Sequence, residues 1–401
     1  MRPCLGTPSL RREQIKLQVA LITPLLHVKG YASPETKAAA EHALALIEQA
    51  EALGEPTEDP LLLFSVLYGV WTSNYVACNG DAVRNLSAQF LALAEKQQAT
   101  APLVTAHRIV GISLAFEGEL VKSRAHFDRA MALYDPVEHR PLATRFSVDA
   151  AVSVLSYRSW DLWILGYPEQ ALADTEQAIS AAREIGQAAT LIYALWHASI
   201  TQIECGNYAR ANAQLDETAG LAADRGASFW QGIATMARGR ILGLTGDAPG
   251  AIQAITSGIA ATRGLGGRVV FPAHMACLAK AYAEIGQFDD ALRTIGEAAS
   301  EIEARWKAEV NRIGGEIALI SPERDAPKAE RWFETALTVA REQQARSWEL
   351  RAAISMARLW RDQGKLQQAR ELLTPVYGWF TEGVDTLDLK EAKALLDTLA
   401  L

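Results

Sequence analysis

The sequence predicts an all-α protein built as an α-solenoid, in which helix-turn-helix repeats stack into a right-handed superhelix. One observation is a short block that returns at a constant interval: GNYARA from Gly206, GDAPGA from Gly246 and GQFDDA from Gly286 lie 40 residues apart. A second is that apolar residues recur at three- and four-residue steps from about residue 11 onward. Such a period is typical of solenoids, and such steps are typical of a helix face buried against a neighbour.

The first hundred residues are expected to contain a lead-in and then helices. Residues 1–10 contain two prolines and are expected to be irregular, and residues 11–100 are expected to form N-terminal helical repeats. Ser33 and Pro34 predict a helix start, with serine as the N-cap and proline at the first helical position, and Gly54 predicts its end. Two further helices are expected over 61–78 and 81–98.

Residues 101–385 are expected to form the main repeat array. In each unit a glycine ends the first helix, because glycine adopts left-handed φ at low cost, and an alanine five positions later lets the second helix pack closely. The predicted turn glycines are Gly118, Gly166, Gly206, Gly246, Gly286 and Gly364. The predicted packing alanines are Ala171, Ala211, Ala251, Ala291, Ala329 and Ala369.

Some segments depart from this pattern. Gly118 and Gly166 lie 48 residues apart, and the excess is expected to be a loop at 135–141. The copy RDAPKA, which begins at Arg324, has no glycine, and residues 268–271 alone resemble a strand. Residues 386–401 are expected to form a capping helix that covers the last apolar face, which brings the predicted total to about nineteen helices.

Composition limits the classes of function. The net charge of −8 argues against a nucleic-acid or anionic-membrane surface. The four cysteines are far apart in the sequence and do not suggest a secreted disulfide framework. The N-terminus does not resemble a signal peptide, and the longest apolar stretch, residues 61–71, is shorter than the roughly 20 residues that cross a bilayer. The sequence therefore predicts a soluble cytoplasmic protein.

The repeated block itself resembles a known repeat. A glycine, often followed by an aromatic residue two positions later and an alanine five positions later, resembles the tetratricopeptide repeat. The usual unit has about 34 residues, so units of 40 imply longer helices. The resemblance implies that the first helices of the units line a concave groove.

The segments between the repeats resemble one particular family. They include EDPLLLFSVLYGVWTSNYVACNGD at 58–81, EHRPLATRF at 138–146 and SWELRAAISMARLWRDQGK at 347–365. These segments resemble the C-terminal region of bacterial multidomain class III adenylate/guanylate cyclases, which also carry a predicted ATPase domain. The resemblance extends from about residue 11 to residue 401. It implies a regulatory or sensor array that acts on cyclase and ATPase domains.

Motifs for catalysis are absent from the sequence. The only Gly-Lys pair, Gly364-Lys365, precedes Leu366 rather than the serine or threonine of a phosphate-binding loop, and the seven histidines form no zinc-binding motif. The sequence therefore predicts no catalytic residue, no cofactor and no metal site. The candidate binding residues are aromatic and basic side chains on the predicted first helices: Tyr157, Arg158, Trp160, Tyr193, His197, Arg238, Arg312, Arg351 and Arg358. The alternative is that the aromatic rings fill space between helices and the arginines form a solvated face.

The sequence thus favours a non-catalytic module that binds a protein or peptide and acts in signal transduction. The expected partner is a cyclase or ATPase domain, in cis or in trans, and neither nucleic acid nor membrane is expected. One alternative is a truncated or split cyclase/ATPase gene product. A less favoured alternative is an α/α-toroid enzyme, in which helix pairs close around a catalytic cavity.

Overall fold

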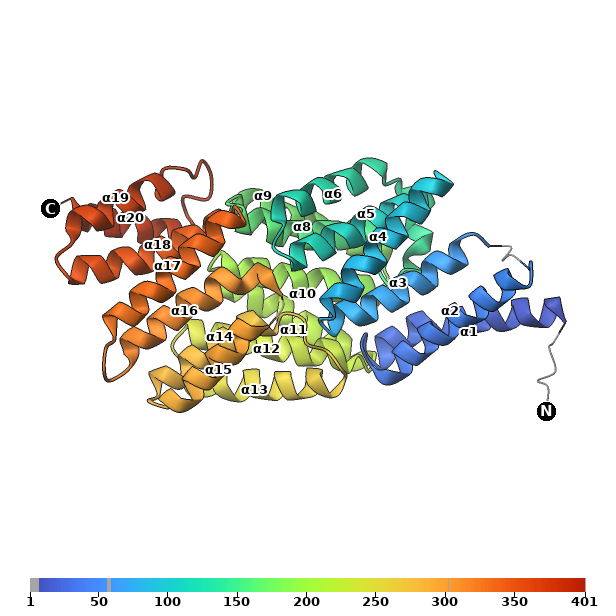
Figure 1. The fold of residues 1–401 in the computed structure, drawn as a ribbon, viewed down its shortest axis with the longest axis horizontal. Coiled ribbons are helices and arrows are strands. Elements are labelled where there is room, and N and C mark those ends of the chain that lie inside the picture. The colour runs from blue at the N-terminus through green and yellow to red at the C-terminus, as the bar shows by residue number, and fades with distance from the viewer. Residues whose placement is uncertain (1–6, 56–58, 302, 401) are drawn as a thin grey trace.

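The chain is an all-α solenoid of the tetratricopeptide-like kind, as the sequence predicts (Figure 1). The computed structural model describes residues 7–55, 59–301 and 303–400. In these ranges it has twenty α-helices, two short 3-10 helices and no strand. None of the described helices is both long enough and apolar enough to span a bilayer.

The N-terminal third consists of antiparallel helices that pair in sequence order. Its elements are α1 (Pro8–Val28), α2 (Pro34–Ala52), α3 (Leu61–Val76), α4 (Gly80–Gln97), α5 (Thr100–Phe116), α6 (Leu120–Leu133), α7 (Pro136–His139) and the 3-10 helix η1 (Arg140–Thr144). Ser33 is the N-cap of α2, and its hydroxyl accepts the backbone N–H of Thr36 at 3.2 Å. Serine at this position satisfies an amide that the helix leaves without a partner.

The remaining elements continue the same packing. They are α8 (Ala150–Ile164), α9 (Pro168–Ile185), α10 (Ala188–Glu204), α11 (Tyr208–Asp224), α12 (Ser228–Leu244), α13 (Ala248–Gly264), α14 (Phe271–Glu284), α15 (Phe288–Ser300), η2 (Ala304–Trp306), α16 (Lys307–Ile320), α17 (Ala326–Glu342), α18 (Arg346–Asp362), α19 (Leu366–Tyr377) and α20 (Leu387–Leu399). In Figure 1 the chain runs from α1 and α2 at one end of the molecule to α19 and α20 at the other.

Three local expectations need correction. Helix α1 begins at Pro8, inside the expected irregular lead-in, because the Thr7 side chain caps it; residues 1–6 lie outside the described residues. The expected loop at 135–141 contains α7 and part of η1, since the Asp135 carboxylate accepts the N–H groups of Val137 and Glu138. Residues 268–271 form no strand: the N–H groups of Arg268 and Val269 both donate to the Val76 carbonyl, and Phe271 starts α14.

The turns between paired helices have one backbone conformation. The turn glycines from Gly118 to Gly364 have φ between +77° and +97°, a region that costs glycine little. The glycine-less copy also has a left-handed residue at this position, since Arg324 has φ +45°. Five positions after each turn from Gly166 on, the alanine is fully buried against the preceding helix: Ala171, Ala211, Ala251, Ala291, Ala329 and Ala369. This geometry fixes how each second helix packs.

The superhelix is tight enough to bring distant repeats into contact. Helix α18 packs against α8, ten helices earlier in the chain. There the Trp163 and Trp348 rings lie 4.7 Å apart, and the Ser347 hydroxyl donates to the Trp163 carbonyl. Trp306 lies 5.8 Å from Trp348 and 6.2 Å from Trp160, measured between ring centroids. These contacts place aromatic side chains from distant repeats together in the interior of the superhelix.

The α1–α2 hairpin touches the middle of the array at its tip. Gly30, in the turn of this hairpin, lies against the Leu265 side chain, and Gly266 lies against the backbone of Ala32. A Cβ atom at Gly266 would lie 2.3 Å from the Ala32 carbonyl oxygen, so this contact depends on a residue without a side chain. The contact joins segments that are more than two hundred residues apart.

Replacing Gly266 by alanine should loosen the α1–α2 hairpin. Gly266 has φ +77° and its Cβ would meet backbone atoms, whereas Gly286 has φ +82° with no atom within 4 Å of its Cβ. Both substitutions carry the backbone cost of about 1–2 kcal/mol, and only the first adds the steric clash. We expect Gly266→Ala to speed amide hydrogen exchange in α1 and α2, and Gly286→Ala to leave it unchanged. Equal exchange in both variants would contradict this contact.

Candidate functional site

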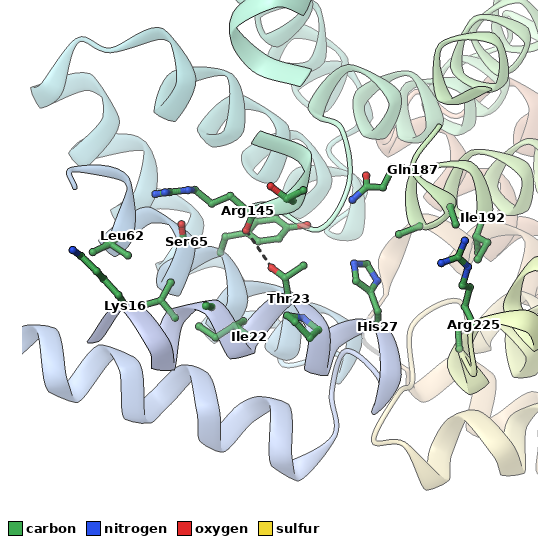
Figure 2. Close-up of a pocket in the computed structure, with 18 of the residues that line it drawn as sticks. Lys16, Ile22, Thr23, His27, Leu62, Ser65, Arg145, Gln187, Ile192 and Arg225 are labelled. Carbon is green, nitrogen blue, oxygen red and sulfur yellow. Dashed lines mark hydrogen bonds between the residues drawn. The ribbon is translucent and has the colours of Figure 1, made fainter. Parts of the chain in front are cut away.

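A cavity lies between the N-terminal helix and the middle of the array, and it is called the outer cavity here (Figure 2). Its volume is about 780 Å³, within the range of roughly 300–1,000 Å³ that is usual for ligand sites. One side is formed by α1 and the other by the start of α10 and the α11–α12 turn. Its lining includes Lys16, Ile22, Thr23, His27, Asp59, Leu62, Ser65, Tyr68, Arg145, Gln187, Ala189, Ile192, Arg225 and Trp230.

The outer cavity has apolar walls and more basic than acidic groups. Lys16 and Arg225 are exposed at its edge. The Arg145 guanidinium donates to Asp59 at 2.6 Å, and its backbone carbonyl accepts the Thr23 hydroxyl at 3.3 Å. Three basic residues and one carboxylate therefore line a cavity in a chain whose net charge is −8.

His27 also lines the outer cavity, on the α1 side. Burial lowers the pKa of its imidazole, which disfavours the charged form. Its ring makes an edge contact with Tyr31 at 6.2 Å between centroids. His27 therefore contributes a neutral, partly apolar surface at neutral pH.

A second, smaller cavity follows directly inward, and we call it the inner chamber. It has a volume of about 50 Å³ and shares Tyr68 and Trp230 with the outer cavity. Aromatic rings from α3, α8, α10 and α12 form most of its wall. These rings belong to Tyr68, Trp71, Tyr75, Tyr157, Trp160, Tyr193, Trp196, His197, Phe229 and Trp230.

The structure brings four of the predicted binding residues together in the inner chamber. His197 is stacked between Tyr193, 4.1 Å away, and Trp160, 4.8 Å away, and Tyr157 meets its edge at 4.8 Å. The expectation that these side chains are exposed along a groove is wrong for Tyr157, Trp160 and His197, which are at most 6% exposed. The tight superhelix covers these three side chains, so they are buried in the interior.

Arg351 and Arg312 lie in a buried ionic network on the C-terminal side of the chamber. The Arg351 guanidinium donates to the Glu204 and Asp388 carboxylates at 2.9 and 2.8 Å, and Arg312 donates to Glu309 at 2.7 Å. Nearby carboxylates raise the pKa of both guanidiniums, against the opposing effect of burial. These arginines hold helices together and do not line either cavity described above.

The other three predicted arginines lie apart from the chamber. Arg158 is mostly buried, and Arg238 and Arg358 are more exposed. Each makes an ion pair with an acidic side chain on a neighbouring helix: Asp174 and Asp128 for Arg158, Asp216 for Arg238 and Glu391 for Arg358. The structure therefore does not gather the nine predicted residues into one site.

Several cavity residues were not predicted from the sequence. Thr23 and His27 come from α1, Arg145 follows η1, and Arg225 ends α11. They occupy no shared position in the repeat, so the 40-residue period carries no signal for them. These residues come together only through the contact between the N-terminal helix and the middle repeats, and the repeat pattern does not predict that contact. Within the described ranges, no three histidine, cysteine, aspartate or glutamate side chains form a metal-binding group.

The fold defines the chain as a tetratricopeptide-like helical repeat protein, and solved structures of this class resemble it. No protein-family model and no curated protein matches the sequence. A Rap protein complexed with competence and sporulation factor has a TM-score of 0.62 at 11% identity, over 96% of this chain and 99% of that chain. At this identity the likeness shows the fold alone.

Two further solved structures have the same arrangement. The apo form of the quorum sensor NprR from B. thuringiensis has a TM-score of 0.52 at 11% identity, over 91% of this chain and 98% of that chain. The Rap conjugation gene regulator of the plasmid pLS20, in complex with the Phr* peptide, has a TM-score of 0.51 at 10% identity, over 96% of each chain. All three therefore resemble this chain over almost their full length.

Proposed function

We propose that this chain is a non-catalytic sensor or interaction module of the cytoplasm, and that it binds a peptide or a protein segment in the outer cavity. The observation that carries the proposal is the cavity of about 780 Å³ between α1 and α10, with apolar walls and basic residues at its edge. An extended segment with apolar and acidic side chains complements both features. Two of the similar solved structures are complexes with a factor or a peptide, which supports this class of ligand.

Binding in this cavity would connect helices that are distant in sequence. A ligand there contacts α1 on one side and α10 on the other. If the ligand binds one position of the α1–α2 hairpin more tightly than another, its binding shifts the hairpin relative to the array. Such a difference in affinity between two arrangements is what a sensor requires. The hairpin is the part through which the ligand would act.

Selection from a random peptide library displayed on phage tests the proposal. The informative variant is Ala189→Trp, since Ala189 lines the outer cavity and an indole there would occupy part of the space that a peptide needs. The control is Ala260→Trp, at an exposed position of α13. We expect peptides that bind the unmodified protein and the control but not Ala189→Trp. Enrichment that survives Ala189→Trp would place binding elsewhere, and absence of any enrichment would contradict peptide binding.

The finer form of the proposal concerns the signalling partner. The connecting segments at 58–81, 138–146 and 347–365 resemble the C-terminal region of bacterial class III cyclases, and we propose that the array regulates a cyclase or ATPase domain. The genes next to this one show whether such domains are encoded separately and would be regulated in trans. We expect purified chain to turn over no ATP alone and to alter the activity of the neighbouring domain. Turnover by the chain alone would overturn the non-catalytic assignment.

A further inference from the structure

The inner chamber contains buried polar atoms that the protein itself leaves without hydrogen bonds. These atoms are Tyr31 Oη, Thr72 Oγ1, Trp196 Nε1 and His197 Nε2, and all four residues line the chamber. Each of the four residues is at most 6% exposed, and the four polar atoms have no hydrogen-bond partner in the described part of the protein. Buried polar atoms are nearly always paired, so four around one small cavity point to a guest that pairs them.

The donor and acceptor roles of these four atoms follow from their chemistry and, for His197, from its neighbour. His197 Nδ1 lies 2.8 Å from the Tyr193 carbonyl oxygen, which can only accept, so Nδ1 carries the proton and Nε2 offers a lone pair. Burial lowers the pKa of His197 to about 3, which keeps the ring neutral. Trp196 Nε1 can only donate, and the Tyr31 and Thr72 hydroxyls can do either. A complementary guest therefore has both an N–H or O–H donor and an acceptor.

The walls of the chamber limit the charge of that guest. The Arg108 guanidinium lies 4.7 Å from the centre of the Tyr68 ring, and the Arg305 guanidinium lies 5.5 and 5.2 Å from the centres of Tyr157 and Trp160. Both arginines are fully buried. Because they already occupy faces of the wall rings, a cationic guest would meet repulsion in place of the usual attraction to aromatic faces. A carboxylate has no proton to donate to His197 Nε2.

The size of the chamber limits the guest further. A volume of about 50 Å³ corresponds to about four water-sized positions. A primary carboxamide with its neighbouring carbon has four non-hydrogen atoms, is planar and uncharged, and has N–H donors and a carbonyl acceptor. We propose that the inner chamber binds the primary carboxamide of an asparagine or glutamine side chain, presented by the peptide that occupies the outer cavity.

In the bound state the carboxamide N–H donates to His197 Nε2, and its carbonyl accepts from Trp196 Nε1. The Thr72 hydroxyl adds a third hydrogen bond. These residues come from α3 and α10, so the guest connects two helices of different repeats. The peptide part of this inference rests on the proposed function, whereas the chamber's preference for a carboxamide is a property that can be measured alone.

Acetamide is the direct probe of the chamber. In protein with ¹⁵N-labelled indoles, we expect acetamide to shift the Trp196 Nε1–H resonance saturably, with a Kd in the range of about 1–100 mM that suits a four-atom ligand. The resonance is assigned by its loss in Trp196→Phe. Acetate at pH 7.5 should bind at least about tenfold more weakly, since it lacks a donor.

The matched variants are Thr72→Val and Thr235→Val. Thr72→Val removes an unpaired hydroxyl from the chamber while keeping its shape, and it should raise the Kd of acetamide by about 3- to 10-fold. Thr235 is on α12 and its hydroxyl donates to the Gln231 carbonyl, so Thr235→Val should leave the Kd unchanged. A Trp196 signal that acetamide does not move means that the chamber holds water only, and the inference is then wrong. Equal affinity for acetate, or no effect of Thr72→Val, would also overturn it.

The two proposals can fail separately. If acetamide binds and the phage selection yields no peptide, the chamber is a carboxamide site and the peptide function is wrong. If peptides bind at the outer cavity and acetamide does not move the Trp196 signal, the proposed function stands without this subsite. If both succeed, selected peptides should contain an asparagine or glutamine whose replacement by aspartate or leucine weakens binding to the unmodified protein at least tenfold.

Discussion

Replacing Arg351 by methionine should lower the free energy of unfolding by about 3–5 kcal/mol, the usual cost of breaking a buried ion pair on one side. The Arg351 guanidinium donates to the Glu204 carboxylate at 2.9 Å, to the Glu204 backbone carbonyl at 3.0 Å and to Asp388 at 2.8 Å. It also lies 4.8 and 5.1 Å from the ring centres of Trp163 and Trp348. Removing the cation takes from the Asp388 carboxylate the guanidinium with which it pairs in a poorly hydrated site, whereas Glu204 keeps Arg240 at 2.7 Å.

Arg358 provides the matched control, because it lies on the same helix two turns later. It pairs with Glu391 at 3.2 Å, and both side chains are at least 40% exposed. Arg358→Met should therefore change the free energy of unfolding by no more than about 1 kcal/mol. Urea unfolding of both variants measures the difference. Similar losses in the two variants would mean that the buried network does not hold α10, α18 and α20 together.

Replacing Asp161 by asparagine should stabilise the protein increasingly as the pH rises from about 4 to 7. Asp161 is fully buried on α8, where it accepts the Ser123 hydroxyl at 2.5 Å, and burial raises its pKa to about 7. Between pH 4 and 7 the folded protein keeps this proton and the unfolded chain has lost it. The unfolded state then binds fewer protons, so the wild-type protein loses up to about 1.4 kcal/mol per pH unit at this group.

Urea unfolding at pH 5, 6, 7 and 8 tests this expectation. The gain of Asp161→Asn over the unmodified protein should grow with pH and become constant above about pH 7, where the aspartate is ionised in both states. Asp224→Asn, at the exposed end of α11, should change stability by less than about 0.5 kcal/mol at each pH. A difference that does not depend on pH, or that shrinks as pH rises, would contradict the protonated state of Asp161.

Much of the fold could be predicted because its determinants are local and repeated. The turn at Gly206 and the alanine at Ala211 lie five residues apart, and the same pair recurs in the next units. Helix periodicity identifies a buried face without any knowledge of its partner. Even the glycine-less turn at Arg324 could be located, because the alanine at Ala329 kept its place.

The candidate site could not be predicted to the same degree, because it depends on contacts between distant segments. The sequence indicated that Tyr157, Trp160 and His197 lie on first helices, and it did not reveal that the superhelix curves tightly enough to bury them. Arg351 and Glu204 lie 147 residues apart, and no spacing rule connects them.

The local sequence around Val270 also gave a wrong prediction, because it resembles a strand. Valine pairs favour strands, yet Val270 has φ +63° and its N–H donates to Glu303 at 2.8 Å. A buried carboxylate from a distant part of the chain holds this backbone conformation, which β-branched residues rarely adopt. Glu303, which decides the local structure, thus lies outside the short stretch of sequence from which propensity predicts a strand.

The contact between α18 and α8 changes what kind of cooperativity the array should have. In an open solenoid each repeat touches only its neighbours, so its stability is close to a sum along the chain and the ends can unravel alone. Here Ser347 and Trp348 of a late repeat support the helix that carries Tyr157 and Trp160. A substitution that destabilises the last repeats should then also destabilise the chamber walls, although the two regions are far apart in the sequence.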